Sequence, residues 1–191
     1  MAARRGWLML RLFVAVEVPE AQKDSVQQAI ASVVVPGARW TSRESWHVTL
    51  KFLGATAEER LAEVTGVVEQ AASTSQPART SLQGLGAFPT FRRARVLWVG
   101  LDDPAGVLAA LARTLEAGFA QHGFPAEGRP WTPHLTVARL KVPAAVALEP
   151  GEIHLDEQPF EVEQVVLFRS HLKAGGAVYE PLARVPLGRP I

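Results

Sequence analysis

The sequence contains no cysteine, and this absence removes several kinds of chemistry at once. Disulfide frameworks, thiolate nucleophiles and zinc sites built on cysteine are all excluded. Long apolar segments are absent as well, since no run approaches the roughly 20 residues that a helix needs to cross a bilayer. Side-chain catalysis must then depend on other groups, and the five histidines are few enough to examine one by one.

Charge of one sign is not in excess either, because 20 lysines and arginines face 19 aspartates and glutamates, for a formal charge of +1. No global field attracts the protein to nucleic acid, so any site for an anion has to be local. The apolar run near the N-terminus is interrupted by Arg11 and Glu17, and no small-residue cleavage site follows it. A cytoplasmic location is therefore expected.

One short pattern occurs twice, as His47-Val48-Thr49-Leu50 and as His134-Leu135-Thr136-Val137, 87 residues further on. In an extended strand alternate side chains share a face, so each histidine lies beside the threonine two residues on. Each copy is typical of a strand with one imidazole and one hydroxyl on its solvated face. A single His-x-Thr is common by chance, but two copies among five histidines indicate a shared function.

The other three histidines have weaker contexts. His122 precedes Gly123 at a predicted helix end, where a cation interacts favourably with the last carbonyls. His154 lies in an alternating segment that has no matching hydroxyl, and His171 follows a strand-like apolar run. These three are set aside as candidates for catalysis.

Hydrophobic periodicity predicts an α+β fold in a chain of 191 residues, which is enough for one core or for two lobes sharing one. Strands are expected at both motifs, around Ile153, and over residues 11–18, 82–88, 96–101, 160–168 and 178–185. Helices are expected after Pro19, after a capping box at residues 56–59, and after Asp103. Similar strands at 95–99 and 164–168 predict two pseudo-symmetric lobes that face each other across a cleft.

Two imidazoles on opposite sides of one pocket suit acid–base catalysis. An unperturbed imidazole titrates near ~6.5, so at neutral pH one can act as base and the other as acid. Such a pair fits the entry of one oxygen and the departure of another at phosphorus, while the hydroxyls of Thr49 and Thr136 can donate to the non-bridging oxygens. The prediction is metal-free phosphodiester chemistry. No H-E-x-x-H spacing favours zinc, and no G-x-S-x-G elbow favours a serine hydrolase.

Several segments also carry a family resemblance, namely residues 10–16, 46–54, 86–89, 95–100, 133–139 and 179–182. Through them the sequence resembles the 2H phosphoesterases, named for two His-x-Thr motifs, and among these the RNA 2',3'-cyclic phosphodiesterases, also called 2'-5' RNA ligases. The resemblance covers nearly the whole chain and implies one bilobal domain over residues 1–191. In this family the first strand sits close to the initiator, so Met9 is a candidate start and residues 1–8 a candidate upstream extension.

The resemblance implies a bilobal 2H phosphoesterase fold, with two pseudo-symmetric lobes of antiparallel sheet and outer helices around a central cleft. It implies an enzyme without metal or cofactor that hydrolyses a terminal 2',3'-cyclic phosphate of RNA to a 2'-phosphate. By motif position, His47 would donate a proton to the departing 3' oxygen and His134 would accept one from the attacking water. The reverse reaction with an RNA 5'-hydroxyl would form a 2'-5' linkage. RNA is the expected partner, a membrane is not, and a monomer is the default.

Two cationic residues are candidates for binding the substrate. Arg139 matches an arginine that follows the second motif in this family and would hold phosphate. Strict alternation puts it on the opposite face from His134, so this role requires a bulge or a strand end. Lys51 has the parity of His47 and can either meet an RNA phosphate or remain a solvated residue at the rim.

Aromatic residues offer a second set of candidates. Phe88 and Tyr179 can each stack on a base or pack internally. Phe52 lies within the first motif segment but has the parity of a core residue.

Two other functions stay open from the sequence. One is the opening of a cyclic phosphate on a nucleotide metabolite such as ADP-ribose 1'',2''-cyclic phosphate by the same four motif residues, which relative rates on the two substrates would separate. The other is a non-catalytic RNA-binding module of the same fold, which predicts that alanine at His47 or His134 leaves every cellular role untouched.

Overall fold

The computed structural model describes residues 8–148, 153, 155, 159–174 and 176–188. His154, residues 1–7 of the suggested extension and most of the segment around Ile153 lie outside the described residues. The strands are β1 (Met9–Glu17), β2 (Ala38–Trp40), β3 (His47–Ala57), β4 (Ala78–Phe88), β5 (Ala94–Asp102), β6 (His134–Ala144), β7 (Phe160–Val162), β8 (Gln164–Lys173) and β9 (Gly176–Pro186). The helices are α1 (Glu20–Ile30), α2 (Leu61–Ser73) and α3 (Val107–Gln121), with 3₁₀ turns η1 (Arg43–Ser45), η2 (Glu58–Arg60) and η3 (Phe91–Arg93).

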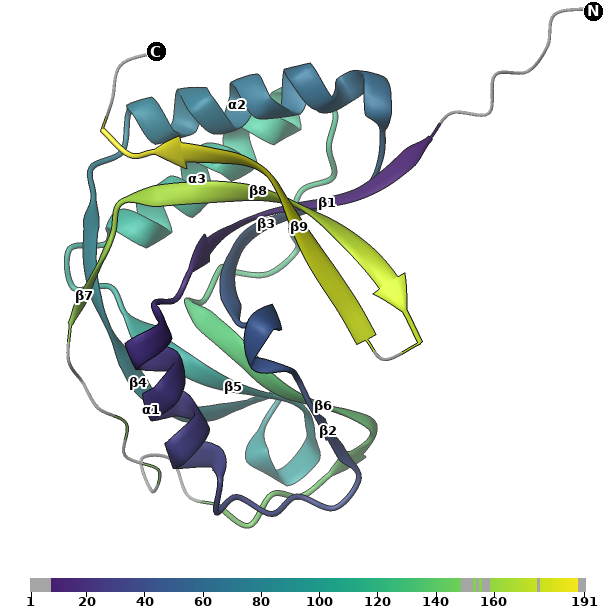
Figure 1. Cartoon of the computed structure of the whole chain (residues 1–191), viewed down its shortest axis with the longest axis vertical. Helices are drawn as coiled ribbons and strands as arrows, with labels where there is room; N and C mark the ends of the chain where they lie inside the picture. The colour runs from purple at the N-terminus through teal and green to yellow at the C-terminus, as the bar shows by residue number, and fades with distance from the viewer. Residues whose placement is uncertain (1–7, 149–152, 154, 156–158, 175, 189–191) are drawn as a thin grey trace, which may run out of the picture.

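All of these strands belong to one sheet, in which every pair is antiparallel. The strand order is β7-β4-β5-β6-β3-β1-β8-β9, and β2 is added beside β6. Figure 1 shows the sheet strongly bent, with β1, β8 and β9 in one arm and β4, β5 and β6 in the other. The expected α+β class is confirmed.

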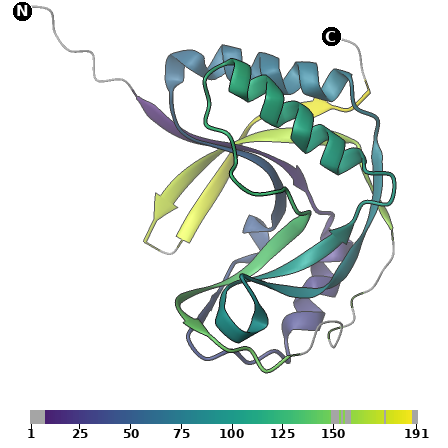
Figure 2. The ribbon, with the colours of Figure 1, turned by 180° about the vertical axis from the view of Figure 1, so that it is seen from behind.

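The bend lies where the two motif strands meet. β3 and β6 pair through Val48 and Leu135, the second residue of each motif. We call β1, β3, β8 and β9 the β3 lobe, and β2, β4, β5, β6 and β7 the β6 lobe. α2 packs on β8 and β9, and α3 packs on β3 and on α2, while α1 lies along the β6 lobe in both views of the ribbon (Figures 1 and 2). The predicted two-lobed arrangement is confirmed.

Helices α2 and α3 bury the faces that their periodicity predicts, whereas α1 is shorter than its apolar pattern predicted. The buried residues of α2 are Val64, Val67, Val68, Ala71 and Ala72, and those of α3 are Leu108, Leu111, Ala112, Leu115 and Phe119. Each large aliphatic side chain that is fully buried contributes about 1.5 to 3 kcal/mol. In α1 only Val26 is fully buried, and because that helix ends at Ile30, Val34 lies beyond it and is exposed.

The two capping predictions had different outcomes. The helix after Asp103 starts later than expected, at Val107 with Gly106 at its N-cap position. Asp103 still serves its first turn, since its carboxylate accepts the N–H groups of Leu108 at 3.2 Å and Ala109 at 2.8 Å. The capping box at residues 56–59 was wrong. Thr56 is a buried residue of β3, which stays extended to Ala57 because β1 pairs with it up to that residue.

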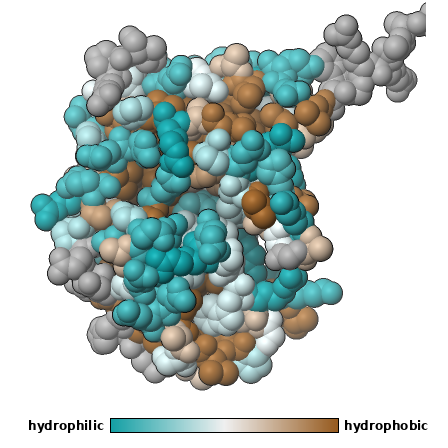
Figure 3. Space-filling view, viewed as in Figure 1, coloured by the Kyte–Doolittle hydropathy of each residue, from teal (hydrophilic) through white to brown (hydrophobic). Residues whose placement is uncertain are grey.

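No helix in the described part of the chain is long and apolar enough to cross a bilayer. The face shown in Figure 3 is mostly hydrophilic at its middle, with hydrophobic residues scattered over it.

Candidate active site

A cavity of ≈ 250 Å³ between the lobes brings the two motifs together. His47 and Thr49 from β3 and His134 and Thr136 from β6 all line it. Its other walls come from β1, from the segment between β2 and β3, from β3 and β6 beyond the motifs, and from the β8–β9 hairpin. The lining residues there include Arg11, Phe13, Thr41, Phe52, Arg139, Ser170, Leu172, Ala177 and Tyr179. All four motif residues therefore face one space, as their parity predicted.

A β-bulge follows the first motif. The pairing of β3 with β1 passes from Thr49 to Lys51 and skips Leu50. An extra residue of this kind shifts the alternation of faces by one. Lys51 is consequently buried, and Phe52 lies on the cavity side with 57% of its surface exposed. The predicted parities of Lys51 and Phe52 were both wrong, because they assumed unbroken alternation.

The same bulge follows the second motif. The pairing of β6 with β5 passes from Thr136 to Ala138 and skips Val137. Arg139 is thereby returned to the cavity side, although strict alternation would have pointed it away from His134. The bulge that a cavity position of Arg139 required is present.

Lys51 is buried on the side of β3 that faces away from the cavity, and it is not at the cavity rim. Its ammonium donates to the carbonyl of Pro125 at 2.7 Å and lies 2.8 Å from a carboxylate oxygen of Glu116 on α3. The other carboxylate oxygen of Glu116 accepts the N–H of Glu127 at 2.9 Å. Lys51 and Glu116 thus fasten the segment between α3 and β6, which leads directly into His134.

Each catalytic candidate histidine is held by the same contact. Nδ1 of His47 lies 2.7 Å from the carbonyl of Ser45, and Nδ1 of His134 lies 2.8 Å from the carbonyl of Thr132. Because a carbonyl can only accept, Nδ1 carries the proton in both neutral rings, and Nε2 keeps its lone pair. Nε2 of His47 lies 3.1 Å from the hydroxyl of Thr49. Both rings are therefore oriented with Nε2 available for proton transfer.

Burial keeps both imidazoles neutral in the free protein. It lowers the pKa of His47 to about 4, against the opposing effect of the hydrogen bond to Ser45, and the charges of His134 and Arg139 lower it further. Burial also lowers the pKa of His134, again with a contribution from Arg139. Desolvation disfavours the charged form of a histidine, so at pH 7 the cavity holds two neutral imidazoles.

Aromatic rings pack against each histidine. His47 lies 4.8 Å from the ring of Phe13 and 4.9 Å from the ring of Tyr179, measured between centroids. His134 lies 5.1 Å from Phe88 in a perpendicular arrangement. Tyr179 lines the cavity and Phe88 is half-buried beside His134, so both aromatic candidates contact a motif histidine.

Two hydrogen-bonded contacts cross from the segment that precedes one motif histidine to the strand of the other. The indole N–H of Trp131, three residues before His134, donates to the carbonyl of Thr49 at 2.9 Å. In the other direction, the hydroxyl of Thr41 lies 3.0 Å from the carbonyl of Thr136 and accepts the indole N–H of Trp46 at 2.9 Å. Each segment that delivers one histidine therefore holds the strand of the other.

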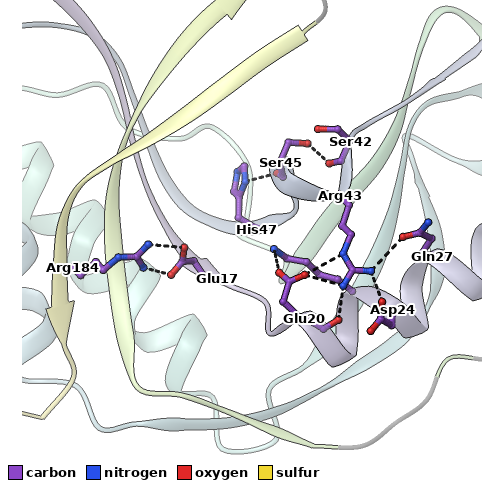
Figure 4. Close-up of polar contacts among 10 residues, drawn as sticks. Glu17, Glu20, Asp24, Gln27, Ser42, Arg43, Ser45, His47 and Arg184 are labelled. Carbon is purple, nitrogen blue, oxygen red and sulfur yellow. Dashed lines mark hydrogen bonds and ion pairs between the residues drawn. The ribbon is translucent and has the colours of Figure 1, made fainter.

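The segment before His47 is also anchored to α1 (Figure 4). Arg43 of η1 forms ion pairs with Glu20 at 2.8 Å and with Asp24 at 2.5 Å. Figure 4 shows Ser45 at the end of the same turn, with its carbonyl at the imidazole of His47. A rigid η1 therefore fixes the orientation of the His47 ring.

Several residues of the cavity were missed by the sequence interpretation. Phe13 and Thr41 carried no recognisable signal, because an apolar residue of a buried strand and a threonine of a loop are common. Phe52 had a usable signal, since it follows His47 at the same spacing at which Arg139 follows His134. Among the described residues, no group of three or more histidines and carboxylates is placed to hold a metal ion.

Known proteins resemble this chain both in sequence and in fold. Residues 19–174 match the 2'-5' RNA ligase superfamily. The RNA 2',3'-cyclic phosphodiesterase of Methanothermobacter thermautotrophicus is 33% identical over 178 residues, which cover 90% of this chain and 96% of that protein. A crystal structure from Thermus thermophilus matches with a TM-score of 0.80 at 31% identity, covering 93% of this chain and 98% of that one. E. coli LigT complexed with 3'-AMP matches with a TM-score of 0.79 at 26% identity, covering 94% and 99%.

Proposed function

This chain belongs to the 2'-5' RNA ligase superfamily, and from that membership we propose that it acts as an RNA 2',3'-cyclic phosphodiesterase that leaves a 2'-phosphate. The observation that carries the proposal is the pair of imidazoles on one cavity, each with Nδ1 held by a backbone carbonyl. Two proton-transfer groups of this kind are what an exchange of oxygens at phosphorus requires.

In the proposed mechanism His134 is the proton acceptor and His47 the proton donor. Nε2 of His134 takes a proton from a water molecule while the water oxygen forms a bond to phosphorus. The bond from phosphorus to the 3' oxygen breaks, and that oxygen takes a proton from Nε2 of His47. The hydroxyls of Thr49 and Thr136 donate to the non-bridging oxygens, where negative charge accumulates. Exchange of one proton with solvent at each histidine restores the starting state.

The low pKa of His47 adds a condition to this mechanism. Because burial brings that pKa to about 4, His47 is neutral before the substrate arrives and has no proton to donate from Nε2. The negative charge of a bound phosphodiester favours the protonated form of a neighbouring imidazole. His47 therefore takes up its proton together with the substrate, and no metal ion is needed in any step.

The residues around the histidines have proposed binding roles. Arg139 would pair with the cyclic phosphate, and its position on the cavity and its electrostatic effect on both histidines support this role. Planar guanidinium groups suit phosphate oxygens. Phe52 and Tyr179 line the same cavity and present aromatic surface on which a base can stack, and Phe88 supports His134. The reverse reaction would join a 2'-end to an RNA 5'-hydroxyl.

The test is incubation of the protein in EDTA with a short RNA that ends in a 2',3'-cyclic phosphate, followed by chromatography of the product terminus. We expect a 2'-phosphate, and a rate lower by about 10² to 10⁴ in both His47→Ala and His134→Ala. His171→Ala is the matched control, because His171 pairs with Glu180 outside the cavity and its loss should leave the rate unchanged. A 3'-phosphate product would reverse the two histidine roles. Loss of activity in EDTA that zinc or manganese restores would overturn the metal-free mechanism.

A further inference from the structure

A second arginine lies beside Arg139 on the same face of the sheet. β2 pairs with β6 in a register that sets Arg39 directly opposite Arg139. Residues directly opposite each other in an antiparallel pair point to the same face. Since Arg139 lines the cavity, Arg39 lies on the cavity face, one strand further out, where Figure 1 shows β2 alongside β6.

No carboxylate of the described residues neutralises this pair of cations. Among the described residues, neither Arg39 nor Arg139 has an ion pair or a hydrogen-bonded side-chain partner, and both are exposed. Other arginines of the chain do form ion pairs, since Arg43 is paired with two carboxylates and Arg184 with Glu17. Like charges directly opposite each other destabilise a sheet. A bound anion would remove that cost.

A third cation extends the same surface. Lys141 follows Arg139 by two residues on β6, so alternation places it on the same face, and it is exposed and without an ion pair among the described residues. Arg139 acts electrostatically on His47, His134 and Tyr179, whereas Arg39 is not among the groups that perturb them. Arg139 is therefore the inner cation of this row, and Arg39 the outer one.

The position of the phosphates in the substrate indicates which group the outer arginine, Arg39, can bind. A 2',3'-cyclic phosphate ends its strand, so every other phosphate of the RNA lies on the 5' side of the reacting nucleotide. With Arg139 at the cyclic phosphate, an outer arginine on the same face can meet the next phosphate of the backbone. Arginine offers a planar fork of donors that matches phosphate oxygens.

We propose that Arg39, supported by Lys141, forms a subsite for the phosphodiester immediately upstream of the cyclic end. This inference rests on the proposed function and deepens it, because it makes the preferred substrate an oligoribonucleotide. A nucleotide that carries only its cyclic phosphate leaves the subsite empty.

The test compares Arg39→Met with the unaltered protein on three substrates: a dinucleotide with a 2',3'-cyclic phosphate end, the same dinucleotide with a neutral methylphosphonate linkage, and a nucleoside 2',3'-cyclic phosphate. The variant should lose kcat/KM roughly tenfold on the first substrate only. The unaltered protein should show a similar loss when the linkage is made neutral, and the variant no additional loss, because the two changes remove the same interaction. The dependence of log kcat/KM on log salt should become shallower by about 0.7 for the dinucleotide.

Arg113→Met is the matched control, since Arg113 is exposed on α3 and lines a different hollow, between α2 and α3. It should behave like the unaltered protein on all three substrates. Equal losses in Arg39→Met on the dinucleotide and the single nucleotide, or no loss on either, would overturn the subsite. If the unaltered protein cleaves none of the substrates, the proposed function itself fails, which is a separate outcome.

Discussion

The strands β3 and β6 follow the same plan as far as the fourth residue of each motif and then differ in what they carry. Both place a histidine and a threonine on the cavity, both hold Nδ1 of the histidine with the carbonyl two residues upstream, and both bulge at the residue after the threonine. Past the bulge, β3 presents Phe52 to the cavity and β6 presents Arg139.

This comparison separates two demands on the site. Proton transfer at phosphorus is a symmetric task, because one oxygen arrives as another leaves, and a matched pair of histidines serves it. Recognition of a nucleotide is not symmetric, since a base offers a flat face and a phosphate offers charge. Most aromatic rings of the cavity come from the β3 lobe, namely Phe13, Phe52 and Tyr179, although that lobe also supplies Arg11. The β6 lobe supplies Arg139, with Arg39 and Lys141 further out on the same face, besides Phe88 next to His134.

Lys51 and Ala138 hold equivalent positions after the two bulges, and they give the largest expected difference in stability. Ala138 needs no partner, whereas the buried ammonium of Lys51 depends on Glu116 and on the Pro125 carbonyl. Breaking a buried ion pair typically costs 3–5 kcal/mol. For Lys51→Met we expect a loss of about 3 kcal/mol in the free energy of unfolding, measured by urea denaturation, because Glu116 stays partly solvated.

Lys141→Met is the control for this substitution, because Lys141 is an exposed lysine of the other motif strand. Its effect on the free energy of unfolding should stay within about 0.5 kcal/mol. Removing Glu116 as well should recover part of the loss in Lys51→Met, since the carboxylate then no longer lacks its cation. Similar effects for the two lysines would contradict the structural role of Lys51.

The two histidines should also differ in how strongly they couple stability to pH. Between about pH 6.5 and pH 4 the unfolded chain binds a proton at His47 that the folded protein does not, so stability falls as the pH falls. The full effect is roughly 3 kcal/mol, lost on going from pH 7 to pH 4. In His47→Asn this part of the pH dependence should disappear. Urea denaturation of both proteins at the two pH values measures it.

His134→Asn sharpens the comparison, because burial lowers the pKa of His134 in the same direction. The pH dependence should weaken in this variant too, and less than in His47→Asn. Titration of the carboxylates changes the free energy of unfolding equally in all three proteins, so it cancels when the variants are compared with the unaltered protein. A pH dependence unchanged by His47→Asn would contradict a neutral, buried imidazole in the free protein.

The same comparison explains which parts of the site were predictable from the sequence. The motif strands were predictable because alternation is local, and the faces of α2 and α3 were predictable because helical periodicity is local too. The bulge before Arg139 could be predicted, because strict alternation would have turned a charged side chain toward the core. Phe52 stands at the equivalent place after an equivalent bulge, but an apolar residue at a core position conflicts with nothing, so its bulge went unnoticed.

Contacts between distant segments were beyond any sequence pattern. The bond from Trp131 to Thr49 spans 82 residues and the bond from Thr41 to Thr136 spans 95. No periodicity relates such residues, because the register of β2 against β6 and the path of the segment before His134 decide them. The partners of Lys51 were hidden for the same reason, being 65 and 74 residues away.

The two crossing contacts give the smallest expected effects, and they differ in an informative way. Trp131→Phe removes a single donor from the carbonyl of Thr49 and should cost about 1 kcal/mol of unfolding free energy. Thr41→Val should cost about 2 kcal/mol, because it also leaves the indole N–H of the buried Trp46 without its acceptor.

Denaturation of Thr41→Val, Trp46→Phe and the double variant separates the loss of the Thr41 bond to β6 from the loss of the acceptor of Trp46. The double variant should lose less than the sum of the single losses, since no unpaired indole N–H then remains. Additive losses would contradict a hydrogen-bonded relay from Trp46 through Thr41 to the carbonyl of Thr136.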